Sequence, residues 1–205
     1  LGSPDSTSIS DVKKYLDEFL MDKRVIGKSY IFRWILVKLI ILNFRPKKSA
    51  KAYKKIWWKD GSPLIVLSRR LFKKVSNLIQ IPVALAMRYG SISIYNGLKE
   101  LNDKGVDEFI ILPLYPHYAM SSYETVVEKV KEEVEINFPE NKIKVIEPFY
   151  DDPKYIELLS LKIKDTIKNI EYDHILFSYH GIPVSHLKIS DTTNTHCYKT
   201  KNCCS

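Results

Sequence analysis

The sequence predicts an α/β fold, a Rossmann-like open parallel sheet with helices on both faces. This prediction rests on the pattern of apolar residues along the chain and on the size of the chain. From Pro63 onward, short apolar runs alternate with longer segments whose apolar residues recur every three or four positions. Strands that are joined by helices in this way run parallel, and the crossovers between them are almost always right-handed. The chain has 205 residues and is 45% hydrophobic, which is enough to bury a core.

Three parts can be distinguished along the chain: a helical N-terminal segment (residues 1–62), a parallel α/β core (63–183) and the start of a Cys-containing insertion or linker (184–205). In the first part, Ser10 is expected to cap a helix with one apolar face. The most apolar stretch, 31–44, predicts a second helix that Pro46 ends. At about 1.5 Å per residue it is about 21 Å long, too short for the ~30 Å core of a bilayer. A basic third helix is expected over 50–59.

The core is expected to contain five parallel strands. The sequence places them at residues 64–67, 83–87, 109–114, 144–147 and 174–178, with helices over 69–79, 92–104, 121–138 and 152–169 between them. The last strand is a short apolar run of the kind that fills the centre of a sheet. It stops at Ser178-Tyr-His180, and Gly181 and Pro183 then break the backbone.

Positive charge is concentrated in one stretch. The formal net charge is +8, and the segment from Lys23 to Lys59 carries twelve Lys or Arg residues and no Asp or Glu. Such asymmetry indicates an anionic partner, which could be a phospholipid, a nucleic acid or a carboxylate-bearing ligand. Solvated helix faces with no partner would give the same pattern.

Polar and aromatic clusters follow three of the predicted strands. They are Arg88-Tyr89, Tyr115-Pro-His117-Tyr118 and Tyr179-His180. The carboxyl ends of parallel strands share one rim of a sheet, where α/β proteins bind their ligands. Arginine binds carboxylates bidentately, tyrosines form flat apolar walls, and histidine handles protons or metals. The clusters therefore suit a planar, acidic, metal-accepting ligand, although each residue could instead be structural, with the histidine bonding only to the following turn.

Several classes of protein find no support in the sequence. It has no G-x-G-x-x-G or G-x-x-x-x-G-K-[ST] motif for nucleotides, no G-x-S-x-G elbow, and no recognised nucleic-acid-binding module. Cys197, Cys203 and Cys204, with His186 and His196, could bind zinc or an iron–sulfur cluster or be free thiols in a loop. No signal peptide is visible, so a reducing cytoplasm is the expected compartment.

Five motifs give the chain a resemblance to a known family. They are Leu1-Gly-Ser-Pro-Asp-Ser6, Gly61-Ser-Pro63, Arg88-Tyr89-Gly90, Leu112-Pro-Leu-Tyr-Pro116 with Ser121-Ser122, and Ser178-Tyr-His-Gly-Ile-Pro183. In this order, and over essentially the whole chain, the sequence resembles ferrochelatase. Ferrochelatases are lyase-type metal chelatases that insert ferrous iron into a porphyrin in haem synthesis.

The resemblance implies roles for individual residues. His180 would be the catalytic histidine, which either binds Fe2+ or takes a pyrrole proton. Arg88 and Tyr115 would bind the porphyrin, with Ser121 and Tyr53 as further residues of the pocket. The resemblance does not distinguish protoporphyrin IX from coproporphyrin as the substrate.

The family also implies a larger architecture, with two Rossmann-like halves and a porphyrin cleft between them. This sequence would supply the first half of a bacterial member and a lip, residues 30–58, where porphyrin enters and a peripheral membrane contact forms. The acidic residue that faces His180 belongs to the second half. We therefore expect this segment alone to be inactive.

Cofactors and alternatives follow from the same resemblance. Some bacterial ferrochelatases carry a 2Fe–2S cluster, for which Cys197, Cys203 and Cys204 are the candidate ligands here. The expected partners are porphyrin and ferrous iron, and no nucleic acid. The alternatives are a chelatase for another metal or tetrapyrrole, a non-catalytic haem- or metal-binding module, and an adaptor that binds nucleic acid or membrane.

Overall fold

A computed structural model describes residues 1–201 and 203 of the chain. These residues form two compact units. The first comprises Leu1–Pro113 and Glu124–Ile146, and the second comprises Leu114–Tyr123 and the described residues from Glu147 onward.

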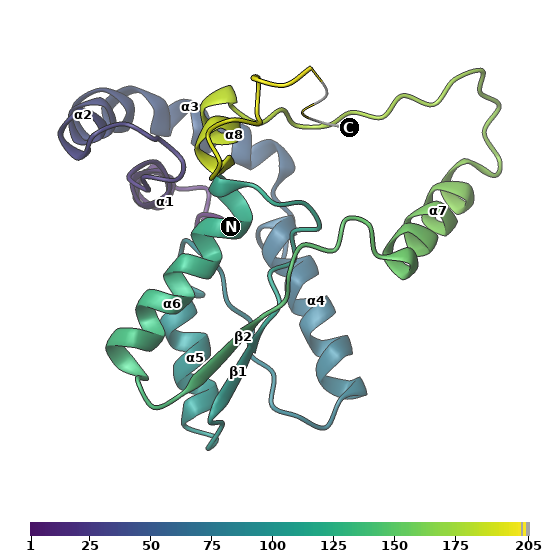
Figure 1. Ribbon diagram of the computed structural model, residues 1–205, viewed down its shortest axis with the longest axis horizontal. Helices are drawn as coiled ribbons and strands as arrows, with labels where there is room; N and C mark the ends of the chain where they lie inside the picture. The colour runs from purple at the N-terminus through teal and green to yellow at the C-terminus, as the bar shows by residue number, and fades with distance from the viewer. Residues whose placement is uncertain (202, 204–205) are drawn as a thin grey trace. The chain divides into compact units, whose positions relative to one another are not determined.

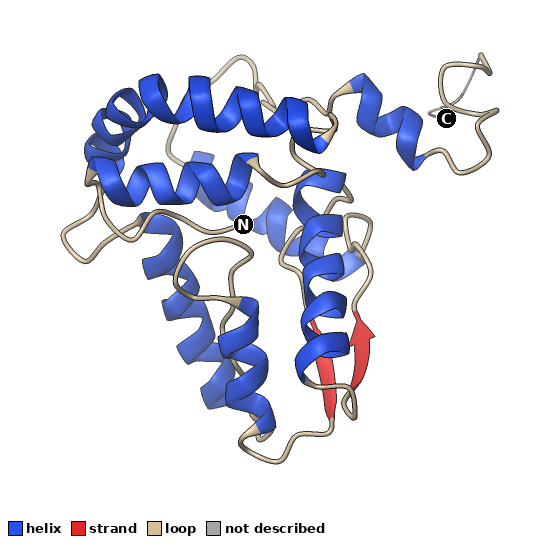
Figure 2. Cartoon of the chain, turned by 90° about the vertical axis from the view of Figure 1, so that its left-hand side faces the viewer, coloured by secondary structure: helices blue, strands red, loops and turns tan. Residues whose placement is uncertain are grey.

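Helices make up most of the first unit, and Figure 2 shows the helices of the chain in blue. The first unit contains α1 (Ile9–Leu20), α2 (Tyr30–Trp34), the π-helical η1 (Ile35–Ile41), α3 (Leu42–Ile56), α4 (Pro63–Leu78), α5 (Ile94–Asn102), β1 (Glu108–Ile111), α6 (Thr125–Asn137) and β2 (Lys142–Val145). The second unit contains α7 (Pro153–Ile167), α8 (Val184–Ser190) and all but the last residue of the π-helical η2 (Met120–Glu124). Among the described residues, no helix combines the length and apolar character needed to cross a membrane.

The strands β1 and β2 pair in parallel, with Glu108 opposite Lys142 and Ile111 opposite Val145. One face of this pair is covered by α5 and α6, which lie together beside the strands in Figure 1. Phe109 is the buried centre of the contact and meets Phe138 edge to face, with ring centroids 6.1 Å apart. The predicted α/β class with parallel strands is therefore confirmed.

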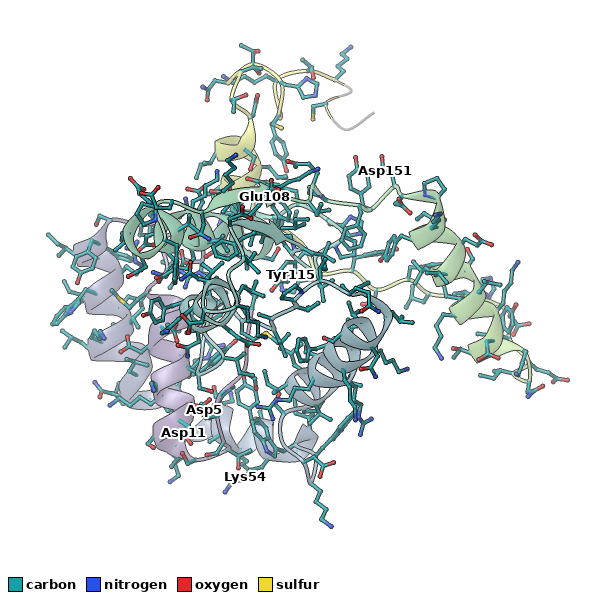
Figure 3. The ribbon with its side chains drawn as sticks, turned by 90° about the horizontal axis from the view of Figure 1, so that it is seen from below. Asp5, Asp11, Lys54, Glu108, Tyr115 and Asp151 are labelled. Atoms are coloured by element: carbon teal, nitrogen blue, oxygen red, sulfur yellow. The ribbon has the colours of Figure 1, made fainter. Side chains whose placement is uncertain are left out.

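A second core lies in the helical part of the first unit. The helix α1 packs its apolar face against η1 and α3, where Val12 and Val37 are fully buried. The first helix begins two residues earlier than predicted, because Ser8, and not Ser10, accepts the hydrogen bond from the Asp11 backbone N–H at 3.1 Å. The acidic side chains of Asp5 and Asp11 lie near this end of α1 (Figure 3), where the helix dipole favours negative charge.

The prediction that Pro46 ends a helix is wrong, since Pro46 lies inside α3. Proline removes one backbone donor from a helix and leaves carbonyl groups to be satisfied in another way. The carbonyl that Pro46 leaves without its helical donor is that of Leu42, four positions earlier and at the first residue of α3. At the same junction, where the π-helical turn passes into α3, the side chain of Asn43 donates to the carbonyl of Leu39 at 2.8 Å.

Three of the five predicted strands are also wrong. Residues 64–67 form the start of α4, because Pro63 suits a first helical turn and an apolar run of four fits either a strand or a helix. Residues 83–87 are irregular apart from a single bridge between Met87 and Ser93. Residues 174–178 form no strand, because no segment of the described chain pairs with them, and Leu176 is 92% exposed. The domain boundaries at 62 and 183 stay predictions.

The N-terminal residues are tied to the segment around Tyr89. The backbone N–H of Tyr89 donates to the carbonyl of Leu1 at 2.7 Å, and Gly2 and Tyr89 form a parallel bridge. Gly2 has φ +131°, and a Cβ atom there would lie 2.0 Å from the Tyr89 carbonyl oxygen. Only glycine fits at this position, both for its backbone conformation and for the close approach of the two segments.

Replacement of Gly2 by Ala should therefore destabilise the protein more than the same change at Gly61. Both residues have positive φ, but nothing lies within 4 Å of a Cβ atom at Gly61. Each variant carries a conformational cost of about 1–3 kcal/mol, and only Gly2→Ala adds a steric overlap. Urea unfolding of the two variants should show the larger loss for Gly2→Ala. Equal losses would contradict the close approach of Gly2 to Tyr89.

Candidate functional site

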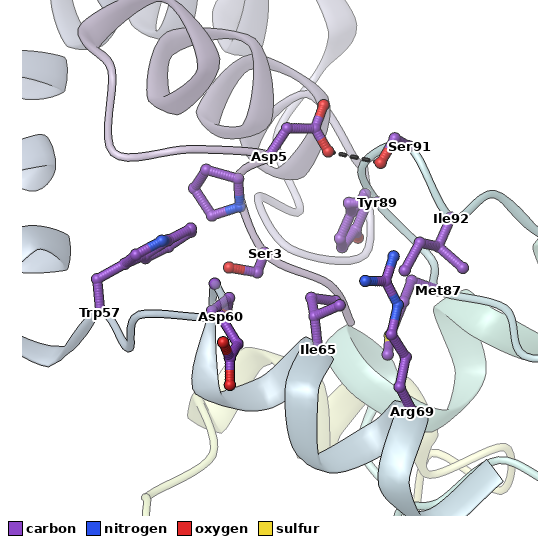
Figure 4. Close-up of a pocket in the computed structure, with 13 residues that line it drawn as sticks. Ser3, Asp5, Trp57, Asp60, Ile65, Arg69, Met87, Tyr89, Ser91 and Ile92 are labelled. Carbon is purple, nitrogen blue, oxygen red and sulfur yellow. Dashed lines mark hydrogen bonds between the residues drawn. The ribbon is translucent and has the colours of Figure 1, made fainter. Parts of the chain in front are cut away.

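Three segments of the first unit meet around a cavity of about 250 Å³. They are residues 3–5, residues 57–65, and residues 87–92, and Figure 4 shows the side chains that surround the space. Arg69 from α4 also lines it. Three of the sequence motifs, Leu1-Gly-Ser-Pro-Asp-Ser6, Gly61-Ser-Pro63 and Arg88-Tyr89-Gly90, thus contribute to one site.

The lining of the cavity is largely polar. The Ser91 hydroxyl donates to the Asp5 carboxylate at 2.6 Å across its rim (Figure 4). The buried Ser3 hydroxyl has no hydrogen-bond partner among the described residues. Pockets that enclose a whole ligand usually measure about 300–1,000 Å³. The cavity therefore suits one polar substituent of a larger molecule.

Arg88 lies beside this cavity in a buried network of hydrogen bonds. Its Nη2 atom donates to Asp22 Oδ2 at 2.7 Å, and its Nε atom donates to Thr125 Oγ1 at 2.9 Å. The guanidinium carbon lies 4.5 Å from the centre of the Tyr89 ring. The Tyr89 hydroxyl donates to Asp22 Oδ2 at 2.9 Å, and the Thr125 hydroxyl donates to the same oxygen. Asp22 is thus the common acceptor of the network.

Burial and hydrogen bonding act in opposite directions on the pKa of Asp22. Burial by itself raises this pKa, but the hydrogen bonds from Thr125, the Arg24 backbone and Tyr89, with the charge of Arg88, outweigh it. The net pKa lies below its usual value, so Asp22 is ionised at neutral pH. Burial raises the pKa of Tyr89, so that its hydroxyl remains a donor.

Tyr53 belongs to a chain of aromatic contacts in the same unit. Its ring meets Tyr15 and Trp57 edge to face, at centroid distances of 6.5 Å and 6.1 Å. Tyr15 in turn contacts Tyr89 at 6.4 Å. Tyr53 and Arg88, two of the predicted porphyrin-binding residues, are thus linked through packed rings, and Trp57 extends the chain to the cavity wall.

Tyr115 and Ser121, the other predicted porphyrin-binding residues, lie in the second unit. Burial raises the pKa of Tyr115 to about 12, so its phenol is neutral. Ser121 is half-buried in η2. His117, from the same polar cluster, stacks on Tyr150 with ring centroids 5.7 Å apart.

His180 is an exposed residue of the second unit. Its Nδ1 atom lies 2.6 Å from the carbonyl oxygen of Gly181. Because a carbonyl oxygen only accepts hydrogen bonds, Nδ1 carries the proton in this arrangement. The lone pair of a neutral ring is then on Nε2, where it can accept a proton or bind a metal.

The cysteine-containing tail does not form a metal site in the described chain. Cys197 and Cys203 are both half-buried, and Cys204 lies outside the described residues. No group of three or more His, Cys, Asp or Glu side chains within residues 1–201 and 203 is placed to hold a metal. Partial desolvation and the nearby Asp191 carboxylate raise the pKa of the Cys197 thiol, which disfavours the thiolate that metals require.

Asp22 and Thr125 were not predicted as residues of the site. They lie 66 and 37 positions from Arg88, and neither belongs to a motif that points to a ligand. Asp22 is the second residue after the amphipathic helix α1, and an acidic residue there equally suits a solvated helix end.

The fold and the site define an α/β protein with a polar cavity, a buried arginine network and an exposed histidine. Comparison with known proteins gives the family: residues 1–204 match the one described as Ferrochelatase. A ferrochelatase of Opitutus terrae is 49% identical over 207 residues, which cover 100% of this chain and 60% of that protein. A ferrochelatase of Pseudomonas fluorescens is 44% identical over 205 residues, with the same coverage.

The chain therefore belongs to the ferrochelatase family. It spans about 60% of the length of these curated relatives.

Substitution of Asp22 by Asn should destabilise the protein by about 3 kcal/mol, because it leaves the half-buried Arg88 without its counter-ion. The pKa of Asp22 is lowered in the folded state, so its contribution to stability is complete above the unfolded pKa of about 3.9. That contribution disappears as the pH falls through the lower, folded pKa. Urea unfolding between pH 7 and pH 2.5 should show that the stability difference between the wild type and Asp22→Asn shrinks as the pH falls, while carboxylates such as Asp191 and Asp11 titrate in both proteins.

Asp17→Asn is the matched control. Asp17 pairs with Lys38 at 2.5 Å, but both side chains are partly exposed, so its loss should cost less than about 1 kcal/mol. Equal losses from the two variants would show that the Asp22 network is no stronger than a surface ion pair.

Proposed function

We propose that the complete protein inserts ferrous iron into a porphyrin, and that this chain carries its catalytic histidine and part of its porphyrin pocket. The single observation that supports this most strongly is the gathering of three ferrochelatase motifs around one polar cavity. The curated relatives that cover the whole chain are named ferrochelatases.

Metal insertion replaces two pyrrole N–H protons by one Fe2+ ion, so both protons must be transferred to a base or to water. His180 is proposed for this step, since its Nδ1 bonds to Gly181 and leaves the Nε2 lone pair available. The same lone pair could instead bind the incoming Fe2+. An acidic partner for this histidine would lie outside the chain.

Porphyrin binding is assigned to four residues with suitable chemistry. Arg88 offers a guanidinium to a porphyrin carboxylate. Tyr115 and Tyr53 offer aromatic walls with neutral phenols, and Ser121 offers a hydroxyl. The choice between protoporphyrin IX and coproporphyrin as the substrate depends on how the protein contacts the carboxylates of the porphyrin.

A peripheral membrane contact is proposed for the predicted lip. Exposed apolar side chains cluster there: Tyr30, Ile31, Phe32, Trp34, Ile35, Leu39, Ile40 and Phe44. They lie within the stretch that carries twelve cations and no acidic residue. Apolar side chains that insert at the interface beside cations that meet anionic headgroups are the usual combination for a membrane-surface segment. We therefore propose that the protein is cytoplasmic and binds the cytoplasmic face of a membrane through this segment.

The double variant Ile31→Ser/Phe44→Ser should therefore bind phosphatidylglycerol vesicles at least about tenfold more weakly, because two inserting side chains are lost. Sedimentation with the vesicles measures this. The control is Leu78→Ser, since Leu78 at the end of α4 is 81% exposed, against 79% for Phe44. Similar sedimentation of the control and the double variant would contradict insertion of the lip.

A 2Fe–2S cluster stays a prediction from the sequence, and no step of the reaction is routed through it. A visible spectrum of the full-length protein, purified without oxygen, tests it directly. Charge-transfer absorbance that disappears in Cys197→Ser and Cys203→Ser would assign these two ligands.

His180→Ala in the full-length protein should lower the rate of Fe2+ insertion into protoporphyrin IX by about 100-fold or more, the usual contribution of a general base. His174→Ala is the control, because His174 is an exposed histidine only six positions away in the same segment. Circular dichroism should show that both variants are folded. A His180→Ala variant with nearly normal turnover would remove the catalytic assignment, and turnover with Co2+ or Ni2+ alone would indicate a related chelatase.

A further inference from the structure

We infer that Asp22 and Thr125 are positioning residues, which fix the Arg88 guanidinium so that its free edge binds a carboxylate of the porphyrin. This inference rests on the proposed function. It adds two residues that do not touch the substrate themselves.

The hydrogen bonds of Arg88 leave one edge of its guanidinium open. The group has five N–H donors, of which Nε bonds to Thr125 and one N–H of Nη2 bonds to Asp22. Nη1 has no hydrogen-bond partner within the described chain. Two N–H groups of Nη1 and one of Nη2 therefore remain, which is the fork that a carboxylate accepts bidentately.

The surroundings hold this fork in one orientation. Thr125 accepts from Nε with its hydroxyl at 2.9 Å and with its carbonyl at 3.2 Å. Tyr89 supports one face of the guanidinium plane. The Asp22 side chain is 4% exposed, whereas that of Arg88 is 16% exposed, so the acceptors are on the inner side of the network. Holding the plane in advance lowers the entropy that a ligand loses on binding.

The charge of Asp22 makes geometry decisive. The Asp22 carboxylate neutralises the single positive charge of Arg88. Charge attraction by itself would therefore bind an incoming anion only weakly. Affinity for a carboxylate then depends on the directional N–H groups of the fork, and thus on their orientation.

Thr125 gives the clearest test, because it is 1% exposed and cannot reach a ligand. Thr125→Val removes the hydroxyl that accepts from Arg88 and donates to Asp22, and keeps the shape of the side chain. Thr125→Ser keeps the hydroxyl and should restore normal binding. Because the Thr125 hydroxyl also contacts Asp22 and Tyr89, a selective effect of Thr125→Val on ligand carboxylates is assigned to Arg88 only if it is lost when Arg88 is replaced.

The experiment is a fluorescence titration of the full-length protein with metal-free protoporphyrin IX and with its dimethyl ester, which lacks both carboxylates. Thr125→Val should weaken binding of the free acid by about tenfold, the effect of one lost hydrogen-bond contact, and leave binding of the ester unchanged. In an Arg88→Met background, Thr125→Val should have no further effect, because residues that act through one another are not additive.

Equal weakening for the acid and the ester would overturn the inference, since it would indicate a general structural role for Thr125. So would additive effects of Thr125→Val and Arg88→Met. If the wild type binds neither the acid nor the ester, the proposed function fails, and the inference fails with it. Normal wild-type binding with an unaffected Thr125→Val variant overturns only the positioning role.

Discussion

The carboxylate of Asp22 accepts hydrogen bonds from four groups: the Arg24 backbone, the Arg88 guanidinium, the Tyr89 hydroxyl and the Thr125 hydroxyl. They come from the turn after α1, from the segment that pairs with the N-terminal residues, and from the start of α6. A buried carboxylate is costly unless its oxygens are satisfied, and here all four donors converge on it. The helical core and the core beside the strands are thereby joined within the first unit.

This network also explains why the segment around Tyr89 is irregular. Tyr89 bonds through its backbone to Leu1 and through its hydroxyl to Asp22, and Gly90 donates its N–H to Glu18 at 3.0 Å. These hydrogen bonds to Leu1, Asp22 and Glu18 determine the backbone path of the segment, which does not continue as a strand. Its side chains and those of residues 3–5 then face the cavity from adjacent positions.

Patterns within one element were predictable, and interactions between distant elements were not. The one-sided apolar faces of α1, α5 and α7 fixed their positions to within a few residues, because a period near 3.6 is visible in the sequence. The run Leu64 to Leu67 was misassigned, since four consecutive apolar residues have no period. The segment 174–178 was expected to be a strand because of its composition, but a strand also needs a partner to bond with. Arg88 was identified from its type and motif, whereas its partners Asp22 and Thr125 required the structure.

The sequence separations in the Asp22 network have a consequence for how the chain folds. Asp22 bonds to Thr125 across 103 positions and to Arg88 across 66, whereas the contacts of α1 with η1 and α3 join segments that are closer in sequence. Contacts between distant segments require more loop closure, so they form more slowly than local ones. We expect the N-terminal helices to assemble first and the Arg88 guanidinium to be oriented only near the end of folding. A newly made chain would then acquire the proposed carboxylate-binding edge of Arg88 only after the helices over residues 30–44 are already formed.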